Sequence, residues 1–388
     1  MPSESPFVYM DHAATTAVDP RVLEAMRPYF NEEYGNASSV HRLGTEARGA
    51  VESARARVAG ILNAKPAEII FTSCGTESDN LALRGVGHAR PGKHIITTPM
   101  EHHAVGHTCQ QLAEAFGFSI TYLPVDAHGA IDPADVERAI AEDTCLISVM
   151  YANNEVGTIE PIARIGEIAR KRGVPFHTDA VQAAGNLNLD VDALGVDLLS
   201  LSGHKFYAPK GVGVLYVREG TDLLPTQTGG DHEQGRRAGT ENVPYIVGLA
   251  RALELAHEDM EDNVAHVTSL RDRLIEGVLD GIPDVRLTGH PTRRLANNAS
   301  FVFEGVEGES VVVHLDRVGV AASTGSACTS EEEGPSFVLS AMGIRDRLAQ
   351  SSLRLSLGRE NTEDDVDYVL AVLPDIVENL RELSPFYD

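Results

Sequence analysis

The chain has 388 residues, 43% of them hydrophobic, and carries 57 acidic against 32 basic side chains, for a formal net charge of −25 at pH 7. This length suffices for two or three domains with a sizeable core, and the acidity argues against nucleic-acid binding. Because no apolar run approaches a membrane span and residues 1–6 lack a signal-like pattern, we expect a cytoplasmic protein that does not bind membranes.

Apolar strands alternate with helical patterns over the first two thirds of the chain, which predicts a parallel sheet covered by helices. Helical spacing over residues 47–62 precedes a predicted strand at 68–72, and Thr76 opens the next helix. The further predicted elements are strands at 94–98, 120–125, 145–151, 175–179, 196–201 and 211–217, a helix at 162–171, and a long amphipathic stretch at 243–279.

After Pro283 the elements become shorter, which predicts a second, smaller α/β domain. Its predicted strands and helices are residues 299–303, 310–315, 318–322 and 353–357, with a closing helix at 364–383. The acidic triplet 331–333 is predicted to be a solvated loop.

Lys205 follows the apolar run 196–201 after a short polar turn that contains Ser202 and His204. Burial lowers the pKa of a lysine, so a lysine at a strand end is a candidate amine nucleophile for an aldehyde. The alternative is an ordinary solvated lysine. Lysine is scarce here, with only five among the 32 basic residues, and Lys210 lies in the same loop.

Polar residues also follow other predicted strands, and carboxyl ends of parallel strands meet at the edge where such folds bind ligands. Gly75 and Thr76 open a helix whose N–H groups suit a phosphate, or Thr76 is a plain helix cap. His102 offers a ring that stacks on a flat cofactor, or is a solvated or core histidine. Asp179 suits a protonated pyridine nitrogen, or caps a helix.

Six stretches of the sequence match motifs of a known enzyme family. They are Tyr9-Met10-Asp11-His12-Ala13-Ala14-Thr15-Thr16, Thr76-Glu77-Ser78-Asp79-Asn80, Asn153-Asn154-Glu155-Val156-Gly157, Ser202-Gly203-His204-Lys205, Ser323-Thr324-Gly325-Ser326-Ala327-Cys328 and Ser352-Leu353-Arg354-Leu355-Ser356-Leu357-Gly358. With them the chain resembles the fold-type I pyridoxal-phosphate enzymes, and more closely the cysteine desulfurases of the class-V aminotransferase family. The resemblance implies an α/β fold with a large cofactor-binding domain (17–260), whose mainly parallel sheet has seven strands, and a smaller α/β domain (1–16 and 261–388).

The resemblance also implies residue roles in a site for pyridoxal 5′-phosphate. Around the ring, Lys205 bonds the aldehyde, Asp179 pairs with the pyridine nitrogen, Gln182 bonds the hydroxyl oxygen, Asn154 lies near that oxygen, and His102 stacks on the ring. The phosphate is held by Gly75, Thr76, Ser202 and His204, together with Thr240 from the other subunit of a homodimer. Arg354 binds the substrate carboxylate with its planar fork, beside Asn154.

The implied reaction converts L-cysteine to L-alanine, with Lys205 and His102 moving protons and Cys328 attacking the substrate sulfur to keep it as a persulfide. The alternative for Cys328 is a small hydrophobe, but the surrounding residues 324–335 favour an exposed loop. Cys74, Cys109 and Cys145 are expected to be packing residues, and the four cysteines lack the spacing of a zinc site or a disulfide framework.

The expected sulfur acceptor is an iron–sulfur scaffold protein or another carrier. The sequence ends at Asp388, so we expect no longer tail of the kind with which some relatives contact a scaffold. Two alternatives differ in function: a selenocysteine lyase or aminotransferase would not require Cys328, and a non-enzymatic acidic scaffold would not retain Lys205, Asp179 and Arg354 together. The acidity and the scarcity of lysine predict a halophilic protein, with an ordinary acidic enzyme as the alternative.

Overall fold

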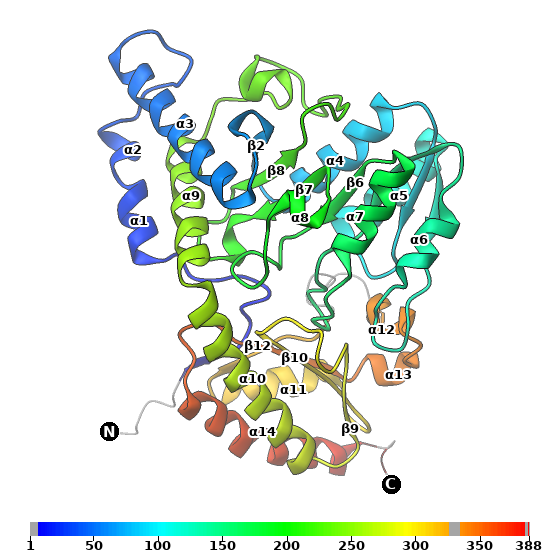
Figure 1. The fold of residues 1–388 in the computed structure, drawn as a ribbon. Helices are drawn as coiled ribbons and strands as arrows, with labels where there is room; N and C mark the ends of the chain where they lie inside the picture. The colour runs from blue at the N-terminus through cyan, green and yellow to red at the C-terminus, as the bar shows by residue number, and fades with distance from the viewer. Residues whose placement is uncertain (1–6, 326–333, 385–386, 388) are drawn as a thin grey trace.

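A seven-stranded sheet forms the centre of the larger part of the molecule in the computed structural model, which describes residues 7–325, 334–384 and 387 (Figure 1). The strands lie in the order β2-β8-β7-β6-β5-β3-β4, and only β8 is antiparallel to its neighbours. Their bounds are β2 Ile69–Thr72, β3 His94–Thr97, β4 Ser119–Tyr122, β5 Thr144–Ser148, β6 Phe176–Asp179, β7 Leu198–Ser202 and β8 Gly213–Val217. The mainly parallel seven-stranded sheet expected from the sequence is confirmed.

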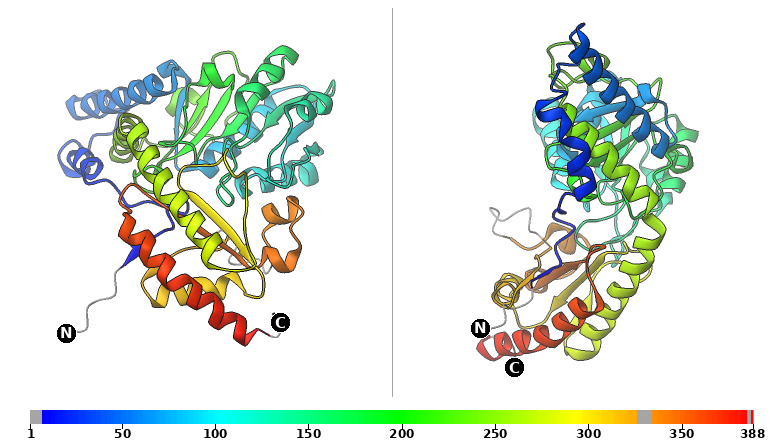
Figure 2. Two further views of the ribbon diagram at one scale, coloured as in Figure 1. Left: turned by 60° about the horizontal axis from the view of Figure 1, so that its bottom comes forward. Right: turned by 90° about the vertical axis from the view of Figure 1, so that its left-hand side faces the viewer.

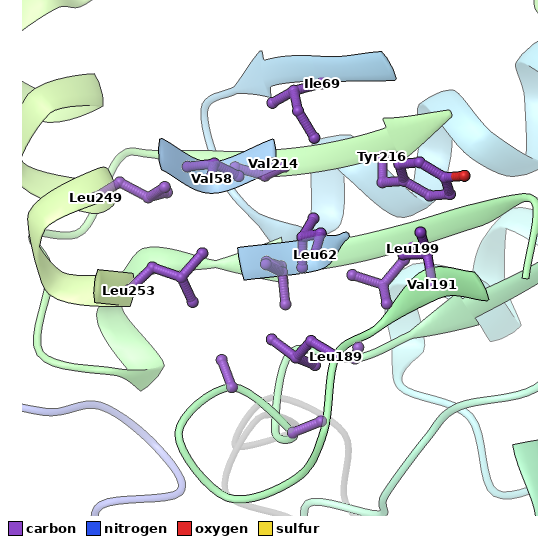
Figure 3. Packing of buried hydrophobic residues seen from close by; sticks show 14 of the residues in the cluster. Val58, Leu62, Ile69, Leu189, Val191, Leu199, Val214, Tyr216, Leu249 and Leu253 are labelled. Atoms are coloured by element: carbon purple, nitrogen blue, oxygen red, sulfur yellow. The ribbon is translucent and has the colours of Figure 1, made fainter. Parts of the chain in front are cut away.

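Both faces of this sheet are covered, because successive side chains of each strand point to opposite sides. Ile69 and Phe71 of β2 face a cluster that includes α3 (Arg42–Leu62), α7 (Ile162–Arg172) and α9 (Val243–Glu258), whereas Ile70 faces α4 (Gly75–Ala89) and α5 (His103–Phe116). Figure 3 shows side chains of α3 and α9 packed against β7 and β8. Burial on two sides explains the nearly continuous apolar strands.

The smaller part is built on an antiparallel sheet of three strands in the order β12-β10-β9, with bounds β9 Val285–Leu287, β10 Asn298–Phe303 and β12 Ser352–Ser356. A buried cluster joins this sheet to α10 (Met260–Gly281), α11 (Gly308–Arg317) and α14 (Glu363–Leu383). Figure 2 shows α9 and α10 following one another from the larger to the smaller part.

The chain begins in the smaller part, where β1 (Val8–Tyr9) pairs in parallel with β11 (Val320–Ala321). Residues 10–16 then cross to the larger sheet. The Ala13 N–H donates to Ser356 Oγ of β12 at 2.9 Å, and the Thr16 N–H donates to the His204 carbonyl at 2.9 Å. This segment therefore touches both sheets.

The remaining elements are short α-helices and 3-10 helices (η) of one or two turns each. Their bounds are α1 Pro20–Met26, α2 Pro28–Asn31, η1 Pro66–Glu68, α6 Pro133–Ala139, α8 Val191–Leu194, η2 Gly203–Lys205, η3 His232–Gly235, α12 Phe337–Ala341 and α13 Asp346–Ala349. Among the residues that the structure describes, it contains no helix that is long and apolar enough to cross a membrane.

Several predicted bounds differ from the structure. The stretch 243–279 is two helices, because Asp259 leaves helical geometry with ψ near 5° and ends α9 as it begins α10. Cys74 is the cap residue of α4, so Thr76 lies inside the helix and is not its cap. The predicted strand 145–151 already ends at Ser148, since the chain then turns into the Ala152–Ile159 bridge.

Candidate active site

Most of the residues expected in the site lie at one edge of the seven-stranded sheet. Asp179 ends β6, Ser202 ends β7, and Gly75 starts the helix that follows β2. These strands all run in one direction, so their carboxyl ends meet at this edge. The alternation of strands and helices in the sequence predicted this convergence.

Lys205 ends the short turn η2 directly after β7. Its Nζ donates to the Ala13 carbonyl at 2.6 Å and to the Ala14 carbonyl at 2.8 Å. Gln182 donates from Nε2 to the same Ala13 carbonyl at 3.0 Å. The N-terminal segment thus holds the Lys205 amine and the Gln182 amide side by side, a contact that the sequence pattern did not predict.

The carboxyl of Asp179 is buried at the floor of this site. Burial raises its pKa, while the Val181 N–H that it accepts at 2.9 Å and the charge of Lys205 act in the opposite direction. Asp79 of α4 is also fully buried, and its pKa is raised well above the ordinary value by burial and by the neighbouring Asp179. A cationic group placed against Asp179 would favour its ionised form.

Two histidines near Lys205 are held neutral. Burial, followed by the charge of Lys205, lowers the pKa of both His102 and His204 to about 4. His102 caps α5 by accepting the Ala104 N–H on Nδ1 at 3.1 Å, and Nδ1 of His204 lies 3.2 Å from Thr15 Oγ1. A neutral imidazole can accept a proton, so the His102 ring suits a proton carrier.

The start of α4 is a glycine at a position where a side chain would not fit. A Cβ built on Gly75 would lie 2.8 Å from Val181 Cγ2 and 3.2 Å from Ser202 Cβ, so a larger residue would close the approach to the first turn of α4. The N-terminal N–H groups of this 15-residue helix and the Ser202 hydroxyl are donors for a phosphate. Thr76 is exposed on the first turn.

Arg354 comes from β12 of the smaller sheet and is buried. It donates to Asp11 Oδ1 at 2.8 Å from Nη2 and to the Asn154 carbonyl at 3.0 Å from Nη1. Its Nε is buried and bonds to none of the described residues. A guanidinium with a free buried donor suits a substrate carboxylate.

Thr240 lies apart from the described residues around Lys205. Thr240 is exposed, and within the described chain no recorded contact joins it to Lys205. Arg237 of the same loop donates to Glu77 of α4 at 2.7 Å.

Cys328 lies outside the described residues, while Cys109 and Cys145 are buried, and burial raises the pKa of their thiols to about 12 and about 11. Those two cysteines are packing residues, as expected.

The residues at this edge of the sheet fit pyridoxal 5′-phosphate. The N–H groups at the Gly75 helix start suit a phosphate, the buried carboxyl of Asp179 suits a cationic ring nitrogen, and the Lys205 amine lies close enough to Asp179 to affect the pKa of its carboxyl. Sequence reasoning missed Asp11 and the Ala13 and Ala14 carbonyls as contacts, although they lie in the quoted stretch 9–16.

The family model described as aminotransferase class-V matches residues 8–369. The chain belongs to the class-V aminotransferase family. Pyridoxal phosphate is the cofactor of this family. This chain is 54% identical over 385 residues to a cysteine desulfurase IscS of Methanosarcina thermophila. The alignment covers 99% of this chain and 95% of that relative.

Solved structures agree with this assignment. A NifS-like protein superposes with a TM-score of 0.91 at 40% identity, covering 96% of this class-V chain and all of the other. SspA in complex with cysteine superposes with a TM-score of 0.80 at 37% identity, covering 92% of this chain and all of the other.

Proposed function

We propose that this class-V enzyme is a pyridoxal-phosphate-dependent cysteine desulfurase that converts L-cysteine to L-alanine and keeps the sulfur as a persulfide on Cys328. The observation that carries the proposal is the 54% identity, over almost the whole chain, to a relative that is named a cysteine desulfurase. The site is consistent with it, because Lys205, Asp179 and Arg354 converge there.

Each residue of the sheet edge has a task in this proposal. The phosphate is bound by Gly75, Thr76, Ser202 and His204, the ring nitrogen by Asp179, the ring hydroxyl oxygen by Gln182, and the ring face by His102. Arg354 binds the substrate carboxylate next to Asn154. When bound, the cofactor supplies a ring that accepts the electron pair left after the substrate loses its α-proton.

Proton movement falls to Lys205 and His102. Lys205 Nζ donates to two backbone carbonyls, which orient the amine in the site. His102 is neutral near pH 7 because its pKa is about 4, so its ring accepts a proton only transiently. Such positioned groups act as general acids and bases.

Sulfur leaves the substrate by nucleophilic attack. The Cys328 thiolate forms a bond to the substrate sulfur, the bond between that sulfur and the β-carbon breaks, and the β-carbon takes up a proton as alanine is completed. The product left on the enzyme is a Cys328 persulfide, whose outer sulfur passes to an iron–sulfur scaffold protein or another acceptor.

Replacement of Cys328 tests the function directly. We expect Cys328→Ser to bind the cofactor and cysteine, with the same change in visible absorbance as the wild-type protein, and to release no alanine, because a serine hydroxyl is far less acidic than a thiol and forms no persulfide. Lys205→Ala is the control for the earlier steps: it should lose both the borohydride-reducible bond to the cofactor and turnover. Rapid alanine release by Cys328→Ser would refute the proposal, as would a reducible bond at Lys210.

The proposed enzyme is a homodimer in which the Thr240 loop completes the phosphate site of the partner subunit. Support comes from the exposure of Thr240 on the Gly235–Thr240 loop. Sedimentation analysis combined with activity assays over a dilution series should show activity falling as the dimer dissociates. A fully active monomer would contradict this arrangement.

We further assign residues 17–260 to a large domain and residues 1–16 and 261–388 to a small one. In support, a buried cluster unites Val8 and Met10 with α10, β10, β12 and α14. The break between α9 and α10 at Asp259 falls at the proposed boundary. The enzyme is proposed to work in the cytoplasm.

A further inference from the structure

Glu155 is a buried acid to which the reaction described above gives no task. It lies in the turn closed by the Ala152–Ile159 bridge, between β5 and α7. Its N–H donates to Asn153 Oδ1 at 2.8 Å, and its carbonyl accepts from Asn298 Nδ2 of β10 at 3.1 Å. The backbone of Glu155 is therefore held by its own turn and by β10 of the smaller sheet.

The side chain of Glu155 is hydrogen-bonded to Ser336 and lies beside Gly325, and both of these residues are far from it in sequence. Ser336 donates from Oγ to Glu155 Oε2 at 2.6 Å, and a Cβ built on Gly325 would lie 2.8 Å from the same oxygen. Gly325 is further fixed by its N–H, which donates to Ser352 Oγ of β12 at 3.3 Å. Gly325 and Ser336 border the stretch of sequence that contains Cys328.

The same carboxyl is close to the substrate-binding arginine. Arg354 donates to the carbonyl of Asn154, the residue before Glu155, at 3.0 Å. Burial raises the pKa of Glu155 to about 7, while the Ser336 hydrogen bond and the Arg354 charge act in the opposite direction. The Glu155 side chain thus lies beside Gly325 and Ser336 and within electrostatic range of Arg354, which is proposed to hold the substrate.

We propose that Glu155 is a positioning residue for the sulfur-transfer step: its carboxyl group holds Ser336 by a hydrogen bond and packs beside Gly325, and so places the residues that border the Cys328 stretch relative to Arg354. The inference rests on the proposed desulfurase function. A reactant that is presented from positioned neighbours reacts with a higher effective concentration. A misplacement of about 1 Å far from the reacting atoms can lower a rate by about a hundredfold.

The test compares Glu155→Ala and Ser336→Ala with the wild-type holoenzyme in single-turnover assays. We expect the rate of alanine formation to fall by about tenfold or more in each variant. The visible spectrum of the bound cofactor and the dissociation constant for cysteine should stay within about twofold of the wild-type values, because neither residue touches the Lys205 cluster in the described contacts. The double variant should be no slower than the slower single variant, since the two groups act as a unit.

Two further sets of variants separate positioning from general stability. Glu155→Gln and Ser336→Thr keep an acceptor and a hydroxyl at the contact and should recover most of the rate. Glu160 is the matched control: it is a buried acid directly after the same turn, and its Oε2 accepts the Ile131 N–H at 3.1 Å. Glu160→Ala should lower the melting temperature without a selective loss of alanine formation.

Several outcomes would overturn the inference. One is a rate of alanine formation in Glu155→Ala that is within twofold of wild type. Another is a fall in this rate that is matched by weaker binding of cofactor or cysteine. A third is a fall of the same size in Glu160→Ala. If Glu155→Ala does not fold, Ser336→Ala alone decides. A wild-type protein that forms no alanine would instead refute the proposed function.

Discussion

Glu101 shows how strongly a single buried carboxyl responds to its surroundings. It directly precedes His102, and its Oε1 accepts the Thr98 hydroxyl at 2.9 Å and the Met150 N–H at 3.0 Å. These hydrogen bonds only partly offset burial, which raises the pKa of Glu101 from 4.5 to about 8. At neutral pH the folded protein therefore carries this group protonated.

Replacement of Glu101 by glutamine should stabilise the protein at alkaline pH. Between pH 4.5 and about 8 the carboxyl is ionised in the unfolded chain but protonated in the fold, so the folded state binds more protons and the free energy of unfolding falls as pH rises. Relative to wild type, we expect Glu101→Gln to gain about 3 kcal/mol between pH 5.5 and pH 8.5. Denaturant unfolding of both proteins at the two pH values measures this gain, and a pH-independent difference would contradict it.

At the scale of elements, one buried ion pair joins α3 to the loop that leads to Thr240. Arg55 of α3 donates to both carboxylate oxygens of Glu233 at 2.7 and 3.0 Å, and Glu233 also accepts the Phe71 N–H at 3.0 Å. Glu233 and Gln234 both have positive φ, 48° and 59°, a conformation that costs a non-glycine residue roughly 1 kcal/mol. The ion pair holds these two residues in the strained turn.

Loss of Arg55 should therefore destabilise the protein. Arg55→Ala leaves the Glu233 carboxylate buried without its charged partner, and we expect the free energy of unfolding to fall by about 3–5 kcal/mol. Arg42 of the same helix pairs with Glu46 on the surface, so Arg42→Ala is the control and should cost at most about 0.5 kcal/mol. Equal effects of the two substitutions in urea unfolding would show that the buried pair has no special role.

At the scale of the whole molecule, the net charge of −25 predicts a stability that depends on salt. Repulsion among exposed carboxylates acts over about 10 Å in 0.1 M salt but only about 3 Å in 1 M salt. We expect the melting temperature to rise by several degrees between about 0.1 M and 2 M potassium chloride as this repulsion is screened. Sucrose stabilises by exclusion from the surface rather than by screening and serves as the control. Melting curves that do not change with salt would count against a halophilic protein.

The amino-acid sequence by itself determined the layered fold and the residues at the ends of its strands. Apolar runs and helical spacing are local signals, so the sheet, its covering helices and the places of Lys205 and Asp179 could be predicted from them. Helix bounds such as the break at Asp259 were missed, because an amphipathic pattern continues across it.

Only the tertiary structure decided which distant residues meet. Ala13 lies 192 positions from Lys205 and Glu155 lies 181 from Ser336, yet each pair is joined by a hydrogen bond. Periodicity reports which face of an element is buried and not which partner covers it. These contacts depend on how two sheets, joined by α9 and α10 and by the N-terminal segment, pack against each other, and no local pattern encodes that geometry.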